Sequence, residues 1–146
     1  MEVNIVYFAF VSANYGGVEQ KIIAQFDALV KHRPNVSLYF VCSFYPKGMF
    51  VSEINKRPNV KVLVNTSTKV KNPYFRRKEK FQLVSKVLKE YNPKNTIVYF
   101  RHPDSDFLFL DFLKANKEYK FITEHQEVEN TFKKSRFNGN GALRLT

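Results

Sequence analysis

The sequence predicts an α/β protein: a doubly wound, mainly parallel β-sheet covered by helices, in a single domain. Short apolar runs of strand length alternate along the chain with segments in which apolar residues recur at helical spacing. The runs at 3–11 and 36–44 lack polar alternation, which is typical of strands buried on both faces. Strands that alternate with helices in this way form right-handed βαβ units, whose strands are parallel. At 146 residues the chain is long enough to bury one core.

The first half of the chain carries three expected strands and one expected helix. The run at 3–11 is rich in β-branched and aromatic residues, and the helical pattern after it extends from 18 to 30. Pro34 ends that pattern, and the second strand is expected at 36–44. The run at 59–65 alternates valines with other residues, so we expect a shorter strand nearer an edge of the sheet.

The second half repeats this alternation. Pro93 ends one helical pattern, and the next helix is expected to begin with Asp104 or Ser105 as its N-cap and Asp106 in its first turn. The segment 106–116 is apolar on most faces, which predicts deep packing or an interface. In chain order, the expected elements are a helix at 81–91, a strand at 96–100, a helix at 106–116 and a strand at 119–123.

Composition narrows the class of protein. Apolar residues make up 44% of the chain and aromatic residues 16%, which argues against disorder. Cys42 is the one cysteine, so no internal disulfide can form and a reducing compartment is the default. The amino terminus has Glu2 where a signal peptide would carry basic residues, and no run approaches the roughly 18 apolar residues that span a bilayer. We therefore expect a cytoplasmic protein, either soluble or peripheral at the inner face of the membrane.

The positive charge is concentrated in one region. The formal net charge is +11, and residues 56–94 contain twelve Lys and Arg against two Glu. Within 68–82, basic side chains mix with Tyr74, Phe75 and Phe81, a composition that suits anionic lipid headgroups. The expected membrane or anion patch consists of Lys69, Lys71, Arg76, Arg77, Lys78 and Lys80.

Two other interpretations of this basic segment stay open. The segment fits a solvated loop and helix start, with only Phe81 in the core. Nucleic acid is a competing partner, because Lys and Arg bind phosphates and aromatic rings stack on bases. However, the chain has no RNP-like pattern, helix-turn-helix or zinc finger, so we do not expect nucleic acid to be the main partner.

Gly16 and Gly17 lie between the first strand and the first helix, in the segment "NYGGVE". A glycine pair at this junction lets backbone N–H groups approach an anion closely, and the helix dipole favours the negative charge. The alternative is a tight turn of no functional importance, with Asn14 as the helix cap. The pair belongs to neither G-x-G-x-x-G nor G-x-x-x-x-G-K-[ST], so it does not define a phosphate site by itself.

Three segments together resemble glycosyltransferase family 4, the group 1 enzymes of the GT-B architecture. The opening "S-x-x-Y-G-G-V-E" is similar to that family's first strand–helix junction. "YFRHPDSDFLFLDFL" looks like its fourth strand, loop and helix, and "FITEHQEVE" resembles its fifth strand ending in a histidine. The resemblance covers essentially the whole chain, but only the amino-terminal half of the family. It implies one Rossmann-like domain, residues 1–146, that forms half of a GT-B fold.

The resemblance also implies roles for particular residues. Gly16 and Gly17 would bind the diphosphate of the nucleotide-sugar donor and stabilise the charge on the leaving group. His125 would line the reaction centre as the catalytic residue. Arg101 and His102 would bind the acceptor, a polysaccharide or a lipid-linked glycan, and a guanidinium suits an anionic acceptor. Members of the family transfer the sugar with retention, generally without a metal ion, so neither a metal nor a cofactor is expected.

The resemblance has limits. The donor-binding domain, with its pair of glutamates, has no counterpart here, so we expect the chain alone to be inactive. Glu124, Glu127 and Glu129 lie near His125, but their spacing fits no metal motif. One alternative is a non-catalytic basic α/β module that binds nucleic acid or an acidic polymer. Another is a stand-alone flavodoxin-like or response-regulator-like protein, which is weakened because "FVSANYGG" has no acidic cluster after the first strand.

Overall fold

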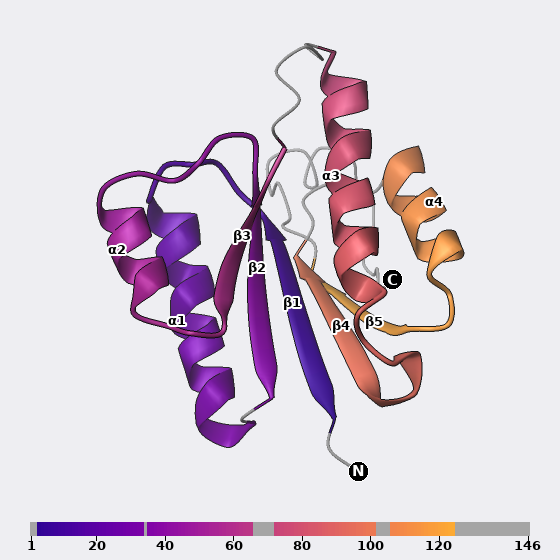
Figure 1. Ribbon diagram of the computed structural model, residues 1–146, viewed down its shortest axis with the longest axis horizontal. Helices are drawn as coiled ribbons and strands as arrows, with labels where there is room; N and C mark the ends of the chain where they lie inside the picture. The colour runs from indigo at the N-terminus through magenta and orange to yellow at the C-terminus, as the bar shows by residue number, and fades with distance from the viewer. Residues whose placement is uncertain (1–2, 34, 66–71, 102–105, 125–146) are drawn as a thin grey trace, which may run out of the picture.

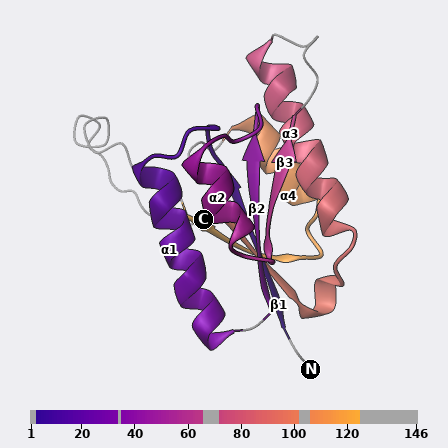
Figure 2. The ribbon, with the colours of Figure 1, turned by 60° about the vertical axis from the view of Figure 1, so that its left-hand side comes forward.

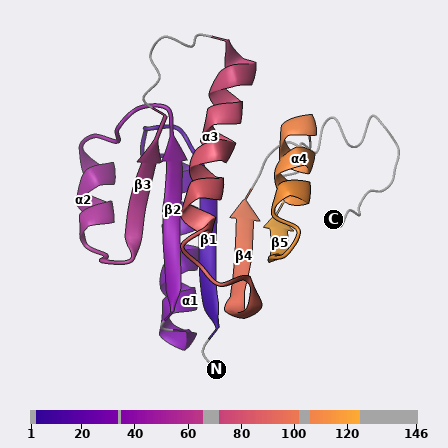
Figure 3. The ribbon, with the colours of Figure 1, turned by 45° about the vertical axis from the view of Figure 1, so that its right-hand side comes forward.

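The computed structural model describes residues 3–33, 35–65, 72–101 and 106–124. The sheet has five strands in the order β3-β2-β1-β4-β5, and every neighbouring pair is parallel. Helices α1 and α2 cover one face of the sheet (Figure 2), and α3 and α4 cover the other (Figure 3). The structure therefore confirms the predicted α/β class and its doubly wound, parallel, single-domain form.

The first elements lie close to their predicted positions. The strand β1 spans Asn4–Phe10, α1 spans Gly17–His32 and β2 spans Val36–Cys42. The strand β3 follows at Val60–Val64 and forms one edge of the sheet, as its weaker apolar pattern predicts. Buried strands of this kind are recognisable because both faces are apolar and the flanking residues are not.

The sequence analysis missed one helix, α2, at Met49–Asn55. It begins after Gly48, whose φ of 62° is a conformation that favours glycine. Of its seven residues, only Phe50 and Ile54 are buried. Two apolar positions one turn apart are too few to give a recognisable helical period.

The second half of the chain starts with α3 at Pro73–Leu88, so the helix is longer at its amino end than expected. Asn72 caps it, since its Oδ1 accepts a hydrogen bond from the Tyr74 amide at 2.8 Å, and Pro73 takes the first helical position. A short 3₁₀ turn, Pro93–Asn95, leads into β4. The remaining elements are β4 at Thr96–Arg101, α4 at Phe107–Ala115 and β5 at Lys120–Glu124.

The N-cap of α4 is Asp106, which corrects the expectation of Asp104 or Ser105. The Asp106 Oδ1 accepts a hydrogen bond from the Phe109 amide at 3.0 Å. The helix buries Leu108, Phe109 and Phe112 but leaves Phe107 83% exposed. Deep packing is therefore confirmed for one side of α4, while its first turn presents an aromatic ring to solvent.

The core consists of two apolar layers, one on each face of the sheet. In the α3–α4 layer, the rings of Phe81, Phe100 and Phe112 pack with centroid separations of 5.3–5.9 Å. In the other layer, α1 contributes Ile22 and Phe26 against the central strands. Among the described helices, none is long and apolar enough to cross a membrane.

The direction of the connections changes beside β1. Chain order runs outward from β1 to β3 on one side, and α3 then carries the chain to β4 on the other side of β1 (Figure 1). In open α/β sheets, such a switch point at the carboxyl ends of the strands is where ligands bind. The fold thus directs attention to the carboxyl ends of β1 and β4.

Candidate functional site

The candidate site lies at the carboxyl edge of the sheet, where all five parallel strands end (Figure 1). The turn with Gly16 and Gly17 follows β1 and opens α1. Arg101 ends β4 and Glu124 ends β5, and these two residues are partners in the strand register. The predicted phosphate-binding and acceptor-binding positions Gly16, Gly17 and Arg101 therefore belong to the same edge.

Gly16 is the N-cap of α1, and its amide already has a partner inside the protein. The Gly16 N–H donates to Glu19 Oε1 at 2.9 Å, and Glu19 is only 5% exposed. No side chain supplies the cap, so the alternative of Asn14 as the capping residue is wrong. A glutamate at this position closes half of a capping box and neutralises part of the positive helix end.

Neither glycine is required by the conformation of the turn. Gly16 has a φ of −120°, which any residue adopts. A Cβ atom at Gly16 would meet Glu19 Oε1 at 3.4 Å, an ordinary contact, and a Cβ at Gly17 would have no heavy atom within 4 Å. The space beside Gly17 is therefore open to solvent or to a ligand.

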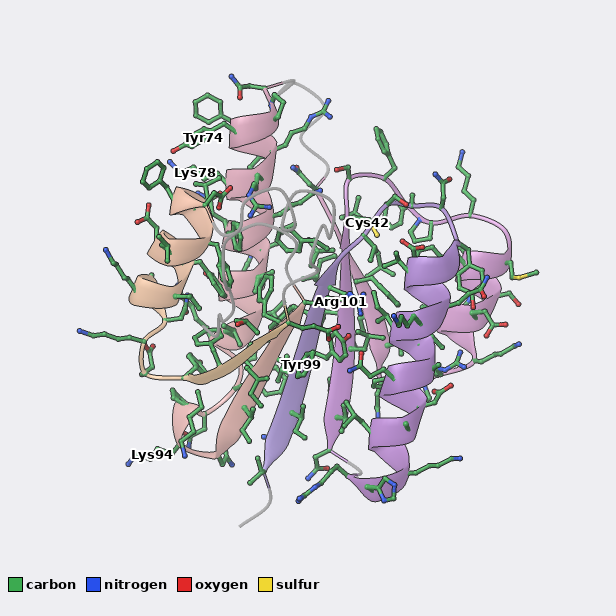
Figure 4. All side chains as sticks on the ribbon, turned by 180° about the vertical axis from the view of Figure 1, so that it is seen from behind. Cys42, Tyr74, Lys78, Lys94, Tyr99 and Arg101 are labelled. Atoms are coloured by element: carbon green, nitrogen blue, oxygen red, sulfur yellow. The ribbon has the colours of Figure 1, made fainter. Side chains whose placement is uncertain are left out.

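Arg101 is buried and belongs to a polar network on the α1 side of the sheet (Figure 4). Its Nη1 lies 3.3 Å from Glu124 Oε2, and the Tyr99 hydroxyl donates to Glu124 Oε1. Tyr99 also accepts a hydrogen bond from Gln25 Nε2 at 3.3 Å, and Gln25 Oε1 accepts one from the Tyr7 hydroxyl at 2.9 Å. The network joins α1 to β1, β4 and β5.

The surroundings of this network keep its tyrosines neutral. Burial raises the pKa of Tyr7 to about 12. Burial, and then the hydrogen bond to Glu124, raise the pKa of Tyr99 as well. Arg101 is the cation of the network and has an internal carboxylate partner, so its role in binding an acceptor remains a prediction.

Four of the predicted residues lie outside the described residues: His125, His102, Lys69 and Lys71. His125 comes directly after Glu124, and His102 directly after Arg101. Because Arg101 and Glu124 are register partners, the chain positions that precede the two histidines are neighbours at the carboxyl edge.

The four described residues of the predicted patch, all on α3, do not share one environment. Arg77 points into the fold: its Nε and Nη2 lie 2.6 Å and 3.2 Å from the two carboxylate oxygens of Asp106. The Arg77 guanidinium also stacks on Phe81 at 5.1 Å. Lys80 is half-buried, whereas Lys78 is exposed near the amino end of α3 (Figure 4). Arg77 and Lys80 thus interact with folded elements, Arg76 is half-buried, and Lys78 is the exposed one of these four described residues.

Sequence reasoning missed three features of this edge. Glu19 stands three residues after the N-cap, and the capping-box spacing could have identified it. The pairing of Arg101 with Glu124 depends on the register of β4 and β5. The electrostatic effect of Lys80 on Cys42 involves residues 38 positions apart in the chain, and no local pattern predicts it.

Comparisons with family models, with curated proteins and with solved structures give no match to this chain. Within the described ranges, no group of three His, Cys, Asp or Glu residues could hold a metal ion. The function of the chain must therefore be inferred from the residues at the carboxyl edge of the sheet.

Proposed function

We propose that this chain is the amino-terminal, acceptor-side domain of a retaining GT-B glycosyltransferase, which transfers a sugar from a nucleotide-sugar donor to a polysaccharide or lipid-linked acceptor. The observation that carries the proposal is the turn at Gly16 and Gly17. It follows β1 beside the switch point of a fully parallel sheet, and neither its φ nor contact with a neighbouring side chain requires glycine there. A ligand that approaches the backbone closely is a physical reason for glycine at such a place.

In this proposal the turn stabilises the leaving diphosphate. The first N–H groups of α1 have no intrahelical acceptors, so preorganised donors face the charge that develops as the sugar–phosphate bond breaks. Because Gly16 donates to Glu19, the Gly17 amide is the first donor for the ligand. The Glu19 carboxylate repels a phosphate at this turn, and so donor binding displaces it.

Two experiments test the transferase proposal. First, the coding sequence beyond Thr146 should encode a second βαβ domain, and an immediate stop codon would refute the assignment. Second, in the enzyme with both domains, His125→Ala and Gly17→Val should lower the rate of sugar transfer strongly without unfolding the protein. Gln20→Ala, on the exposed side of α1, is the matched control and should transfer sugar at the unaltered rate.

We further propose that the amino end of α3 attaches the protein to an anionic membrane. Lys78, Tyr74 and Phe75 are exposed there, the two rings by 52% and 49%. Phe107 is exposed as well, and it follows Asp106, the residue that Arg77 of α3 binds. Basic residues each contribute roughly 1 kcal/mol near an anionic surface, and aromatic rings settle at the headgroup level.

The membrane proposal is tested by co-sedimentation with vesicles that contain phosphatidylserine. Lys78→Glu combined with Tyr74→Ser should weaken attachment, most clearly at low salt, because surface charges are screened as salt rises. Lys114→Glu on α4 alters the net charge as Lys78→Glu does and serves as the control. Equal attachment of both variants would refute docking through α3, and preferential binding to an oligonucleotide would favour the nucleic-acid alternative.

A further inference from the structure

Lys80 stands where α3 passes the carboxyl ends of β1 and β2. Its ammonium Nζ is 5.8 Å from the centre of the Phe10 ring, at the end of β1. Its charge also acts on the pKa of Cys42, the last residue of β2. The charge of Glu19, on α1, acts on the same thiol. A cation from one face of the sheet thus reaches the edge where the glycine turn lies.

The Lys80 ammonium has no carboxylate partner in the described part of the chain. On its own helix, Arg77 and Arg76 repel it, and the neighbouring Glu79, one carboxylate oxygen of which is buried, forms no ion pair with it among the described residues. Asp106 of α4 is engaged with Arg77, and the Glu19 carboxylate accepts the hydrogen bond from the Gly16 amide. The cation–π contact with Phe10 is favourable but leaves the positive charge uncompensated.

The directions in which the pKa values of Lys80 and Cys42 are shifted agree with this arrangement. Burial, together with smaller repulsion from Arg77 and Arg76, lowers the pKa of Lys80 below its ordinary value. Burial raises the pKa of the Cys42 thiol to about 11, so no thiolate balances the charge at neutral pH. A half-buried charge without a counter-charge destabilises a fold, and such groups concentrate at functional sites.

We propose that Lys80 is the centre of an anion-binding site that takes a phosphate group at the carboxyl edge of the sheet, beside the Phe10 ring. A phosphate supplies a counter-charge that no described ion pair provides to Lys80, and it accepts hydrogen bonds from the ammonium. The inference concerns phosphate binding alone. It stands whether or not the protein transfers sugars.

Four proteins test this inference: the wild type, Lys80→Met, Lys80→Arg and Lys86→Met. Lys86 is an exposed lysine of the same helix and is the matched control. Inorganic phosphate, titrated at pH 7 with lysine side-chain NMR signals as the readout, should bind the wild type saturably and raise the pKa of Lys80. Lys80→Met should weaken phosphate binding by roughly tenfold or more, since a charge-assisted hydrogen bond is lost. Lys80→Arg and Lys86→Met should bind within a few-fold of the wild type.

Urea unfolding separates a ligand-binding lysine from a structural one. Without phosphate, Lys80→Met should unfold at a higher urea concentration than the wild type, because it removes an uncompensated charge and keeps the apolar stem. A lower midpoint, or phosphate affinity equal to that of the wild type, would overturn the inference.

Vesicles distinguish the two sources of the phosphate. If the phosphate belongs to a lipid, Lys80→Met should bind vesicles of phosphatidic acid in phosphatidylcholine more weakly than the wild type does. Unchanged vesicle binding with lost affinity for inorganic phosphate would assign the site to a soluble phosphate ester. If Lys80→Met binds both the vesicles and inorganic phosphate as tightly as the wild type, the inference is overturned. This outcome does not depend on any sugar-transfer assay.

Discussion

Arg77 joins two helices by binding the residue that caps one of them. Its guanidinium, on α3, forms two hydrogen bonds with the carboxylate of Asp106, whose Oδ1 also accepts from the Phe109 amide of α4. Asp106 is therefore held from both sides. The pair fixes the start of α4 against α3 on the face of the sheet where both helices pack.

We expect Arg77→Met to lower the free energy of unfolding by about 2 kcal/mol, because hydrogen bonds to a charged group are worth about 1.5–3 kcal/mol. Asp106→Ala should cost about 1 kcal/mol more than Asp106→Asn, since asparagine retains the cap and alanine does not. Urea unfolding measures all three. Lys78→Met, one residue from Arg77 and exposed, should change stability by less than about 0.5 kcal/mol. If Arg77→Met is as stable as Lys78→Met, the pair has no structural role.

Because Glu19 caps α1, its removal should lower the stability of the fold and strengthen anion binding at the glycine turn. Glu19→Ala leaves the Gly16 amide without its acceptor and should reduce stability by about 1 kcal/mol. The same substitution removes a negative charge from the amino end of α1, so pyrophosphate should bind the variant more tightly than the wild type. Amide chemical shifts at Gly16 and Gly17 report this binding. Weaker pyrophosphate binding by Glu19→Ala would show that the carboxylate does not compete for this turn.

A pH dependence is expected from the pair of Asp27 and Arg57. Arg57 Nε and Nη2 donate to the two carboxylate oxygens of Asp27, each at 2.8 Å. This hydrogen bonding lowers the pKa of Asp27 in the folded state. A depressed carboxyl pKa contributes stability above the unfolded value of about 3.9, and the contribution is lost as the pH falls through the folded pKa.

The effect should be small because the Asp27 side chain is 45% exposed. We expect Arg57→Met to lose about 1 kcal/mol or less at pH 7 and to lose less once Asp27 is protonated, when the loss of the hydrogen bond from Arg57 Nη1 to the Glu53 carbonyl remains. The pKa of Asp27, followed by carboxyl NMR signals, should rise toward its ordinary value in this variant. Lys61→Met on β3 is an exposed control that should leave that pKa unaltered. A constant difference in stability at every pH would exclude the ion pair as its source.

The sequence was sufficient to place the five strands within one or two residues. The runs of β1 and β2 are apolar on both faces, and the other three combine β-branched or aromatic residues with flanking polar residues, a pattern that does not depend on tertiary contacts. The short helix α2 was missed because Phe50 and Ile54 alone carry its buried face. The amino-terminal extension of α3 was missed because basic residues occupy its first turns, where apolar periodicity is absent.

The candidate site was predictable in part. The glycine turn is a local pattern, and the chain order of strands and helices places it at the carboxyl edge. The internal partners of Arg101 and Arg77 were not predictable, because Glu124 and Asp106 reach them only through strand register and helix packing. Among the basic residues predicted to bind a ligand or a membrane, Arg101 and Arg77 form ion pairs within the fold, whereas Lys78 faces solvent.

The reactivity of Cys42 tests the burial of the carboxyl edge. Its side chain is fully buried, and burial raises its pKa to about 11. At pH 8 the thiolate fraction should be about a thousandth, compared with about a quarter for an ordinary thiol with a pKa of 8.5. We expect Ellman's reagent to react with the native protein at least roughly 100-fold more slowly than with the protein in urea, because the thiolate is both scarce and shielded.

Arg101 offers the decisive comparison between a structural and a binding role. Arg101→Met leaves the Glu124 carboxylate without its guanidinium and should lower the free energy of unfolding by about 2 kcal/mol, less than for a fully buried pair because Glu124 is partly exposed. Combined with Glu124→Gln, the two losses should not add, and the coupling measured by a double-mutant cycle should be about 1 kcal/mol. Tyr99→Phe, which removes only the hydroxyl bound to Glu124, reports the same network without changing its charge. If the losses from Arg101→Met and Glu124→Gln add fully, Arg101 is not held by Glu124 in solution, and its guanidinium is free for an anionic acceptor.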